Sequence, residues 1–169
     1  YERKDLLLTP EQRDALKEVS NIASGKAVTA ISNLMKSKTK IDINVRQVIV
    51  QELFALNNRE FDPGEIIIGI RALLKNDLNG VIFLMFSIDE LKFLVEEVSD
   101  ITKIPSKIQN VNELDESAYS AFQEIGNIII SHYAAGISDL LRIDIYHEVP
   151  EIAVGEYNAL IDVELAKLA

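Results

Sequence analysis

A short polar pattern occurs twice in this chain, 106 positions apart, and it constrains the fold more than any other feature. The later copy is the segment 120–127, SAFQEIGN, and the earlier copy is the segment 14–21, DALKEVSN. In both copies a glutamate follows a small polar residue by four positions, and an asparagine follows the glutamate by three. The spacing predicts an internal duplication built on two similar helices.

The first copy lies in a segment with a strong helix start. Thr9 can cap the helix, Pro10 suits the first helical position, and Gln12 can complete a capping box. Apolar residues then recur at steps of three and four to about Met35, which predicts one buried stripe: Leu16, Val19, Ile22, Ala23, Ala27, Ala30, Ile31 and Leu34. At about 100° per residue, the side opposite this stripe carries Asp14, Glu18, Asn21 and Gly25.

The second copy lies in a helix predicted from near Asn112 to about Leu141. Its expected buried positions are Phe122, Ile125, Ile128, Ile129, Tyr133, Ile137 and Leu140. The opposite side carries Ser120, Glu124, Asn127 and Ser131. Apolar similarity between two amphipathic helices is common, but packing does not require the same glutamate and asparagine at two exposed positions.

The remaining segments predict strands and shorter helices. A strand is expected at Ile41–Gln51, and two strands at Glu65–Leu74 and Val81–Phe86 form a hairpin closed by Asn79-Gly80, which tolerate positive φ. A capping box at residues 87–90 opens a helix to about Val98, a short strand spans Arg142–His147, and a final helix is expected at Val154–Leu168 with Ala159, Val163 and Ala166 inward.

These elements predict one α+β domain over residues 1–169 with two similar halves. The first repeat spans about 9–100, a polar linker with Pro105 spans about 101–111, and the second repeat spans about 112–169. The second repeat has no counterpart of the hairpin, so it is expected to be truncated. An unfinished half leaves a sheet edge to be covered, which makes strand exchange or an oligomer compatible with the sequence.

Composition excludes several functions. The net charge of −10 argues against sequence-independent nucleic-acid binding and against docking to anionic lipid. The absence of cysteine excludes thiolate chemistry, and two histidines, His132 and His147, argue against a His-rich metal site. No apolar run is long enough to span a bilayer and no leader pattern opens the chain, so a soluble cytoplasmic protein is expected.

The glutamate–asparagine pair suits a docking site on an exposed helix face. Glutamate supplies a charge that can bind a cation of a partner, and an amide can orient a water molecule for attack on phosphorus without titrating. Read as a single copy, these residues are ordinary surface side chains. The repetition at identical spacing favours function.

The pattern Asp/Ser-x3-Glu-x2-Asn-x22-Pro resembles the signature of the CheC/CheX/FliY family of chemotaxis phosphatases. Ser120, Glu124, Asn127 and Pro150 match it at every spacing. The first copy matches at Asp14, Glu18 and Asn21, but Asn44 stands at the proline position and Ser20 replaces the usual glycine. Two copies in one chain resemble the CheC branch rather than the single-motif CheX branch.

The resemblance implies a fold and an activity. The fold would have two pseudo-symmetric halves, with paired long helices on a continuous, mostly antiparallel sheet. The activity would be hydrolysis of the aspartyl phosphate of the response regulator CheY. Glu124 and Glu18 would contact a lysine of CheY, and Asn127 and Asn21 would position the attacking water. The chain itself would bind no metal or cofactor, because Mg²⁺ would be held by CheY. The receptor deamidase CheD is a further partner that the resemblance suggests, with Ala134–Leu141 as its contact.

Two alternatives remain open from the sequence. The chain could be a non-catalytic module of the same architecture, either a flagellar switch component or a CheD-binding adaptor. The two helices could also pack an oligomer, in which case Glu18 and Glu124 would be buried or paired. His132 is expected at the surface or on the rim of the phosphatase face, and His147 at a strand end.

Overall fold

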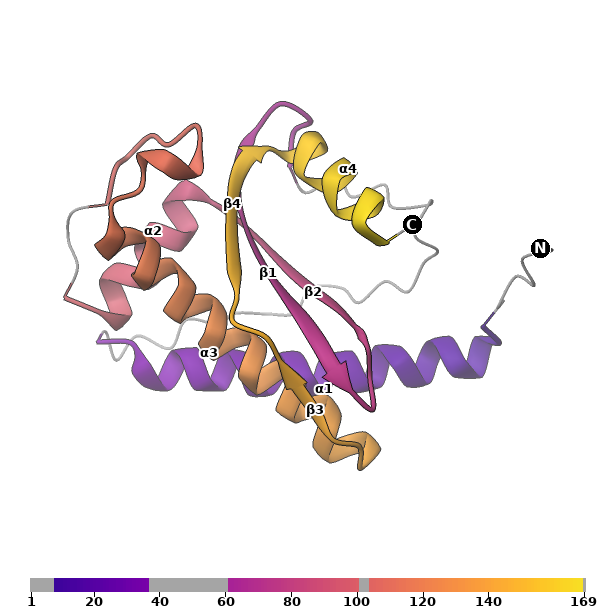
Figure 1. Ribbon diagram of the computed structural model, residues 1–169. Helices are drawn as coiled ribbons and strands as arrows, with labels where there is room; N and C mark the ends of the chain where they lie inside the picture. Colours follow the sequence, from indigo (N-terminus) through magenta and orange to yellow (C-terminus); the bar gives the residue numbers. More distant parts are fainter. Residues whose placement is uncertain (1–7, 37–60, 101–103, 169) are drawn as a thin grey trace.

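The computed structural model describes residues 8–36, 61–100 and 104–168. Within these ranges the chain forms four α-helices, one 3₁₀ turn and an antiparallel sheet of four strands, which confirms the α+β class (Figure 1). The strand expected at Ile41–Gln51 and the start of the expected linker lie outside the described residues. The elements are α1 (Pro10–Leu34), β1 (Ile66–Asn76), β2 (Gly80–Ser87), α2 (Ile88–Val98), η2 (Val111–Glu113), α3 (Glu116–Leu141), β3 (Ile145–His147), β4 (Glu151–Glu156) and α4 (Tyr157–Leu168).

The two long helices start at equivalent positions of the repeat. Thr9 caps α1 with the expected capping box, its hydroxyl accepting from the backbone N–H of Gln12 at 3.2 Å. The start predicted for the second helix at Asn112 is wrong by four residues. Residues 111–113 form a separate 3₁₀ turn, and the cap of α3 is Asp115, whose carboxylate accepts from the Ala118 N–H at 2.7 Å. Thr9 and Asp115 are 106 positions apart, like the two motifs.

The sheet is built around β1, which pairs on one side with β2. The predicted hairpin is confirmed, but its turn differs from the expected one. Asn76 adopts positive φ, 84°, whereas no described glycine has positive φ, so Gly80 does not supply the turn conformation. The Asn76 amide is held by Asp144, donating to its carboxylate at 3.0 Å. Asp144, two residues after the C-cap of α3 at Arg142, therefore helps to shape this turn.

The other side of β1 is covered by β3 and β4 in succession. Leu74 pairs with His147, and Arg71 pairs with Glu151. Between these pairs, residues 148–150 lie opposite only two residues of β1, so the pairing shifts by one. This is a bulge, and Pro150, which has no N–H to donate, lies within it.

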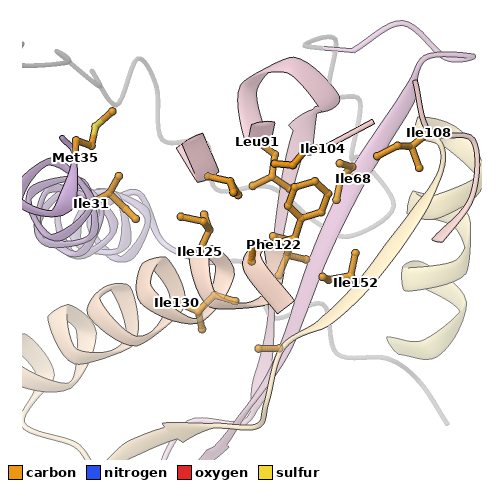
Figure 2. Close-up of a cluster of buried hydrophobic side chains, with 14 residues drawn as sticks. Ile31, Met35, Ile68, Leu91, Ile104, Ile108, Phe122, Ile125, Ile130 and Ile152 are labelled. Atoms are coloured by element: carbon orange, nitrogen blue, oxygen red, sulfur yellow. The ribbon is translucent and has the colours of Figure 1, made fainter. Parts of the chain in front are cut away.

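One face of the sheet carries the core (Figure 2). Phe122 of α3 is fully buried among side chains of β1, β4 and α2, including Ile68, Ile152 and Leu91. The opposite face is covered by α4 (Figure 1). Arg71 alternates with the core residues of β1 and therefore points to this second face. Its Nε donates to the buried Glu164 carboxylate of α4 at 2.6 Å.

The expected last helix begins too early. Residues 154–156 belong to β4, and α4 starts at Tyr157. The inward positions were also wrong: Ala159, Val163 and Ala166 are exposed, while Tyr157 and Glu164 are buried. The ion pair with Arg71 determines which side of this weakly patterned helix faces the sheet.

The predicted apolar stripes were partly right. In α1, Ala23, Ala27 and Ile31 are buried, but Leu16, Ile22 and Leu34 are 37–48% exposed. In α3, Phe122 and Ile125 are buried and Leu140 is exposed; the other four expected positions are half-buried. Among the described elements, α1 packs mainly on α3 rather than on the sheet.

The two long helices meet at small residues. A Cβ on Gly136 would lie 2.6 Å from the Cα of Ala23, so the backbones approach closely there. Beside this contact the Lys26 ammonium donates to the Asp139 carboxylate at 2.5 Å. Among the described helices, none has the length and apolarity needed to cross a membrane.

Candidate functional site

The second motif lies on the outward side of α3. Ser120 and Glu124 are exposed, Asn127 is half-buried, and the three occupy one stripe of the helix. In the described part of the chain, neither the Glu124 carboxylate nor the Asn127 amide has a hydrogen-bond or ion-pair partner. Within this chain both side chains are available to a ligand.

The inner side of the same helix turn is pressed against the sheet. Gly126 is buried, and a Cβ at this position would lie 2.4 Å from Cγ2 of Ile70 on β1. Ile125 is also buried, in the core shown in Figure 2. The backbone that carries Glu124 and Asn127 is therefore held in place by packing against the sheet, as a preorganised site requires.

A hollow of about 350 Å³ lies between α3 and the end of α2. It is mostly apolar, with Val95, Val98 and Ile125 in its lining, and Ser120 and Glu124 border it. A carboxylate at the edge of an apolar hollow suits a long cationic side chain, whose methylene stem can be covered while its charge meets the glutamate.

Pro150 lies on the other side of the motif. Its side chain is fully buried, and its carbonyl oxygen accepts a hydrogen bond from the Gln123 amide at 2.7 Å. The structure thus brings the proline of the pattern to the helix that carries Glu124. It does so through Gln123, a residue that the sequence analysis did not single out.

A second contact from this strand was also not predicted. The Ser131 hydroxyl lies 2.8 Å from Nε2 of His147. His147 is the last residue of β3, as expected, but Ser131, which was expected on the outward stripe, is half-buried against this strand. Their contact links residues 16 positions apart, and nothing in the local pattern could have indicated it.

The first motif is exposed throughout. Asp14, Glu18 and Asn21 all lie on the solvent side of α1. The Asp14 carboxylate forms a 3.7 Å ion pair with Lys17, and the described residues contain no partner for Glu18 or Asn21. The proline position, Asn44, lies outside the described residues.

Next to the first motif, a groove runs between the two long helices. Its lining includes Ile22, Gly25 and Lys26 of α1, together with His132 of α3. His132 is exposed as expected, and its Nδ1 lies 2.8 Å from the Ile128 carbonyl oxygen, so the ring caps its own helix turn. None of Asp14, Glu18 and Asn21 lines this groove, whereas Ser120 and Glu124 line the hollow between α2 and α3.

In the described ranges, no group of three or more histidine, aspartate or glutamate side chains gathers in a way that could hold an ion. The site is thus a surface that presents a carboxylate and an amide.

Comparison with known proteins gives this arrangement a context. The CheC-like family model matches the chain over residues 11–45 and 118–154, each containing one motif copy. The CheY-P phosphatase CheC of Bacillus subtilis (strain 168) is 26% identical over 160 residues, which cover 94% of this chain and 74% of that protein. The crystal structure of Thermotoga maritima FliY matches with a TM-score of 0.68 and 24% identity, over 90% of this chain and 73% of that one.

The fold and the paired helix motifs thus define a CheC-type architecture. The chain is similar to the CheC-like family at both motif copies. The similarity to FliY supports the fold, and the relative named as a phosphatase bears on function.

Proposed function

We propose that this protein is a phosphatase that hydrolyses the aspartyl phosphate of a CheY-like response regulator. The observation that carries the proposal is the pair Glu124 and Asn127, unpartnered on the outward side of a helix that is fixed to the sheet. The same pair recurs at Glu18 and Asn21. The relative named as a CheY-P phosphatase aligns with nearly the whole chain.

In the proposed mechanism Glu124 binds the partner. Its carboxylate borders the hollow between α2 and α3, which can receive a lysine side chain of the response regulator. Ser120 lies on the same border, one turn earlier, and is assigned to partner binding. At the first motif, Glu18 and Asp14 take these positions. The hollow would cover the methylene groups of the lysine side chain, and its ammonium group would pair with the glutamate carboxylate, so both contacts would stabilise the complex.

Asn127 positions the attacking water. An amide can donate and accept hydrogen bonds together, so it can orient a water molecule in line with the phosphorus–oxygen bond. The water oxygen forms a bond to phosphorus, and the bond from phosphorus to the aspartate oxygen breaks. Inorganic phosphate and the free carboxylate are released. Asn21 has the same role at the first motif.

The proposal assigns Mg²⁺ to the response regulator. The second motif supplies one carboxylate, Glu124, and the first supplies Asp14 and Glu18, and the described residues offer no ion-binding cluster. The protein thus contributes orientation and partner binding, which carry much of the rate in phosphoryl transfer. A cytoplasmic location follows from the proposed partner.

The test is loss of phosphate from a phosphorylated CheY-like protein. The unmodified chain should accelerate it, Asn127→Ala and Asn21→Ala should each reduce the acceleration, and the double variant should abolish it. Unchanged dephosphorylation by the double variant would contradict the assignment. Binding without any acceleration by the unmodified chain would favour the alternative, a non-catalytic module or adaptor, for which CheD is the further candidate partner.

A further inference from the structure

The bulge at residues 148–150, which we name the β3–β4 link, is fastened to α3 at both ends. At one end the Gln123 amide donates to the Pro150 carbonyl oxygen at 2.7 Å. At the other end Ser131 bonds His147, the last residue of β3, at 2.8 Å. Gln123 and Ser131 lie four residues before and four residues after Asn127.

These two contacts place the link beside Asn127. The eight residue steps from Gln123 to Ser131 rise about 12 Å along the helix axis. The extended chain from His147 to Pro150 spans about 10 Å. The lengths match, and the order is reversed, so the link runs antiparallel along α3. Its middle residues, Glu148 and Val149, therefore lie level with Asn127.

The direction of the Ser131–His147 hydrogen bond follows from the other ring nitrogen. Nδ1 of His147 lies 2.8 Å from the Glu148 carbonyl oxygen, which can only accept. Nδ1 therefore carries the proton, and in the neutral ring Nε2 is the acceptor. The Ser131 hydroxyl donates to it. Each polar group of the contact has a matched partner, which fixes the histidine ring and the start of the link.

The middle of the link presents an apolar side chain to solvent. Val149 is 73% exposed, the largest exposed fraction among the large hydrophobic residues of the described chain. Glu148 is engaged elsewhere, in a 3.6 Å ion pair with Lys75 of β1. Pro150 is buried and anchors the link below. Bulges often re-aim a side chain beside a functional site, and this one aims Val149 outward.

We propose that the β3–β4 link is the second half of the docking surface at the α3 motif, with Val149 as an apolar contact for the phosphorylated receiver. Gln123, Ser131 and His147 are positioning residues that hold the link beside Asn127. This inference rests on the proposed function, because it names the same partner. It adds a contact strip on the side of Asn127 that faces away from the Glu124 hollow.

The α1 motif lacks the residues for such a link. Positions equivalent to Gln123 and Ser131 hold Lys17 and Gly25, and those equivalent to His147 and Pro150 hold Ile41 and Asn44. Lys17 instead pairs with Asp14. The chain therefore contains its own reference site, with the same glutamate and asparagine but without the positioning residues.

The experiment uses an Asn21→Ala background, in which only the α3 motif carries its asparagine. Val149→Asp, Gln123→Met and Ser131→Ala are compared, with Ser131→Thr as the conservative variant that keeps the hydroxyl. Val163→Asp is the matched control, since Val163 is also exposed but lies on α4, across the sheet. The measurements are KM and kcat for dephosphorylation, Kd for a CheY-type receiver domain carrying beryllofluoride, and Tm.

Loss of one hydrogen bond is expected to raise KM and Kd by about 3- to 10-fold in Gln123→Met and Ser131→Ala, with kcat nearly unchanged. Val149→Asp should raise both at least as much, and Ser131→Thr should restore them. Val163→Asp should have no effect. Unchanged KM and Kd in Val149→Asp, or losses that follow Tm alone, would overturn the proposal.

The readouts separate this proposal from the proposed function. If the Asn21→Ala parent binds the receiver but does not accelerate hydrolysis, and Val149→Asp weakens that binding, the link assignment stands and the phosphatase assignment fails. If the parent accelerates hydrolysis and Val149→Asp leaves KM and Kd unchanged, the phosphatase assignment stands and the link assignment fails. If the parent does not bind the receiver, both fail.

Discussion

The helices α1 and α3 carry the same motif on different supports. Both start at equivalent positions, and both present a glutamate and an asparagine outward. Yet none of the residues buried in α3 has a buried counterpart in α1. Phe122 is fully buried, and its counterpart Leu16 is 40% exposed; Gly126 is pressed on Ile70, and its counterpart Ser20 is half-buried. The two helices therefore share the exposed polar motif but not the buried positions beneath it.

This difference shows which similarity is informative. Two amphipathic helices share apolar residues because both bury one side. Here the buried sets differ, so a common packing requirement cannot explain the common Glu and Asn. Their repetition therefore points to a shared surface role, and the supports determine how well each copy is held.

The largest expected effect compares the two asparagines. We predict that Asn127→Ala reduces dephosphorylation more than Asn21→Ala, because the turn of α3 that carries Asn127 is fixed to the sheet where Gly126 meets Ile70. Loose positioning at a reacting centre costs up to about 100-fold in rate, so the α1 motif should contribute the smaller share. Initial rates with a phosphorylated CheY-like protein measure this. Equal losses of rate in the two variants would contradict the prediction that the α3 motif contributes more to dephosphorylation than the α1 motif.

A second pair of variants tests the platform beneath the motif. Gly126→Ala adds a Cβ that would lie 2.4 Å from the buried, β-branched Ile70. The overpacking should exceed the gain in helix propensity and lower the free energy of unfolding by about 1–3 kcal/mol. Ser20→Ala at the equivalent position of α1 should change it by less than about 0.5 kcal/mol. Urea unfolding curves measure both, and similar values would show that the two platforms do not differ.

A smaller effect of opposite sign is expected at Gly25. No atom lies within 4 Å of a Cβ added there, and the residue lies inside α1. Gly25→Ala should raise the free energy of unfolding by about 0.5–1 kcal/mol through helix propensity. The control is Gly136→Ala, which should destabilise because its Cβ would meet the backbone of Ala23 at 2.6 Å. Destabilisation by Gly25→Ala would show that the surface of α1 at Gly25 has no room for an added Cβ, which would contradict the open surface described for α1.

The smallest effect concerns the far end of α1. The Lys36 ammonium donates to Asp100 at 2.8 Å and to the Ser99 carbonyl oxygen at 2.6 Å, which ties this end to α2. The hydrogen bond from Lys36 holds the pKa of Asp100 below its ordinary value. Because folding lowers the pKa of this carboxyl group, its ionised form stabilises the folded state at pH values above the ordinary pKa. This stabilisation is lost as the pH falls through the pKa of the folded state. Lys36→Ala should raise the pKa of Asp100 in an NMR titration. No change would show that this end is not held by the ion pair.

The sequence alone determined the features that depend on local chemistry. The caps at Thr9 and Ser87, the hairpin of β1 and β2, and the outward placement of Glu124 and Glu18 follow from spacing and side-chain type, and the structure confirms them. The periodicity of one helix is enough to decide which residues oppose its apolar side.

The tertiary structure decided what depends on contacts between distant residues. The side of α4 that faces the sheet is set by the Arg71–Glu164 ion pair, and weak periodicity in that segment gave the wrong side. The β3–β4 link is set by a one-residue shift in strand pairing and by the hydrogen bonds of Gln123 and Ser131. Register and side-chain hydrogen bonds between separate elements leave no period in the sequence, because each partner is specified only by the position of the other. The sequence therefore identified the motif, and only the tertiary structure distinguished its two supports.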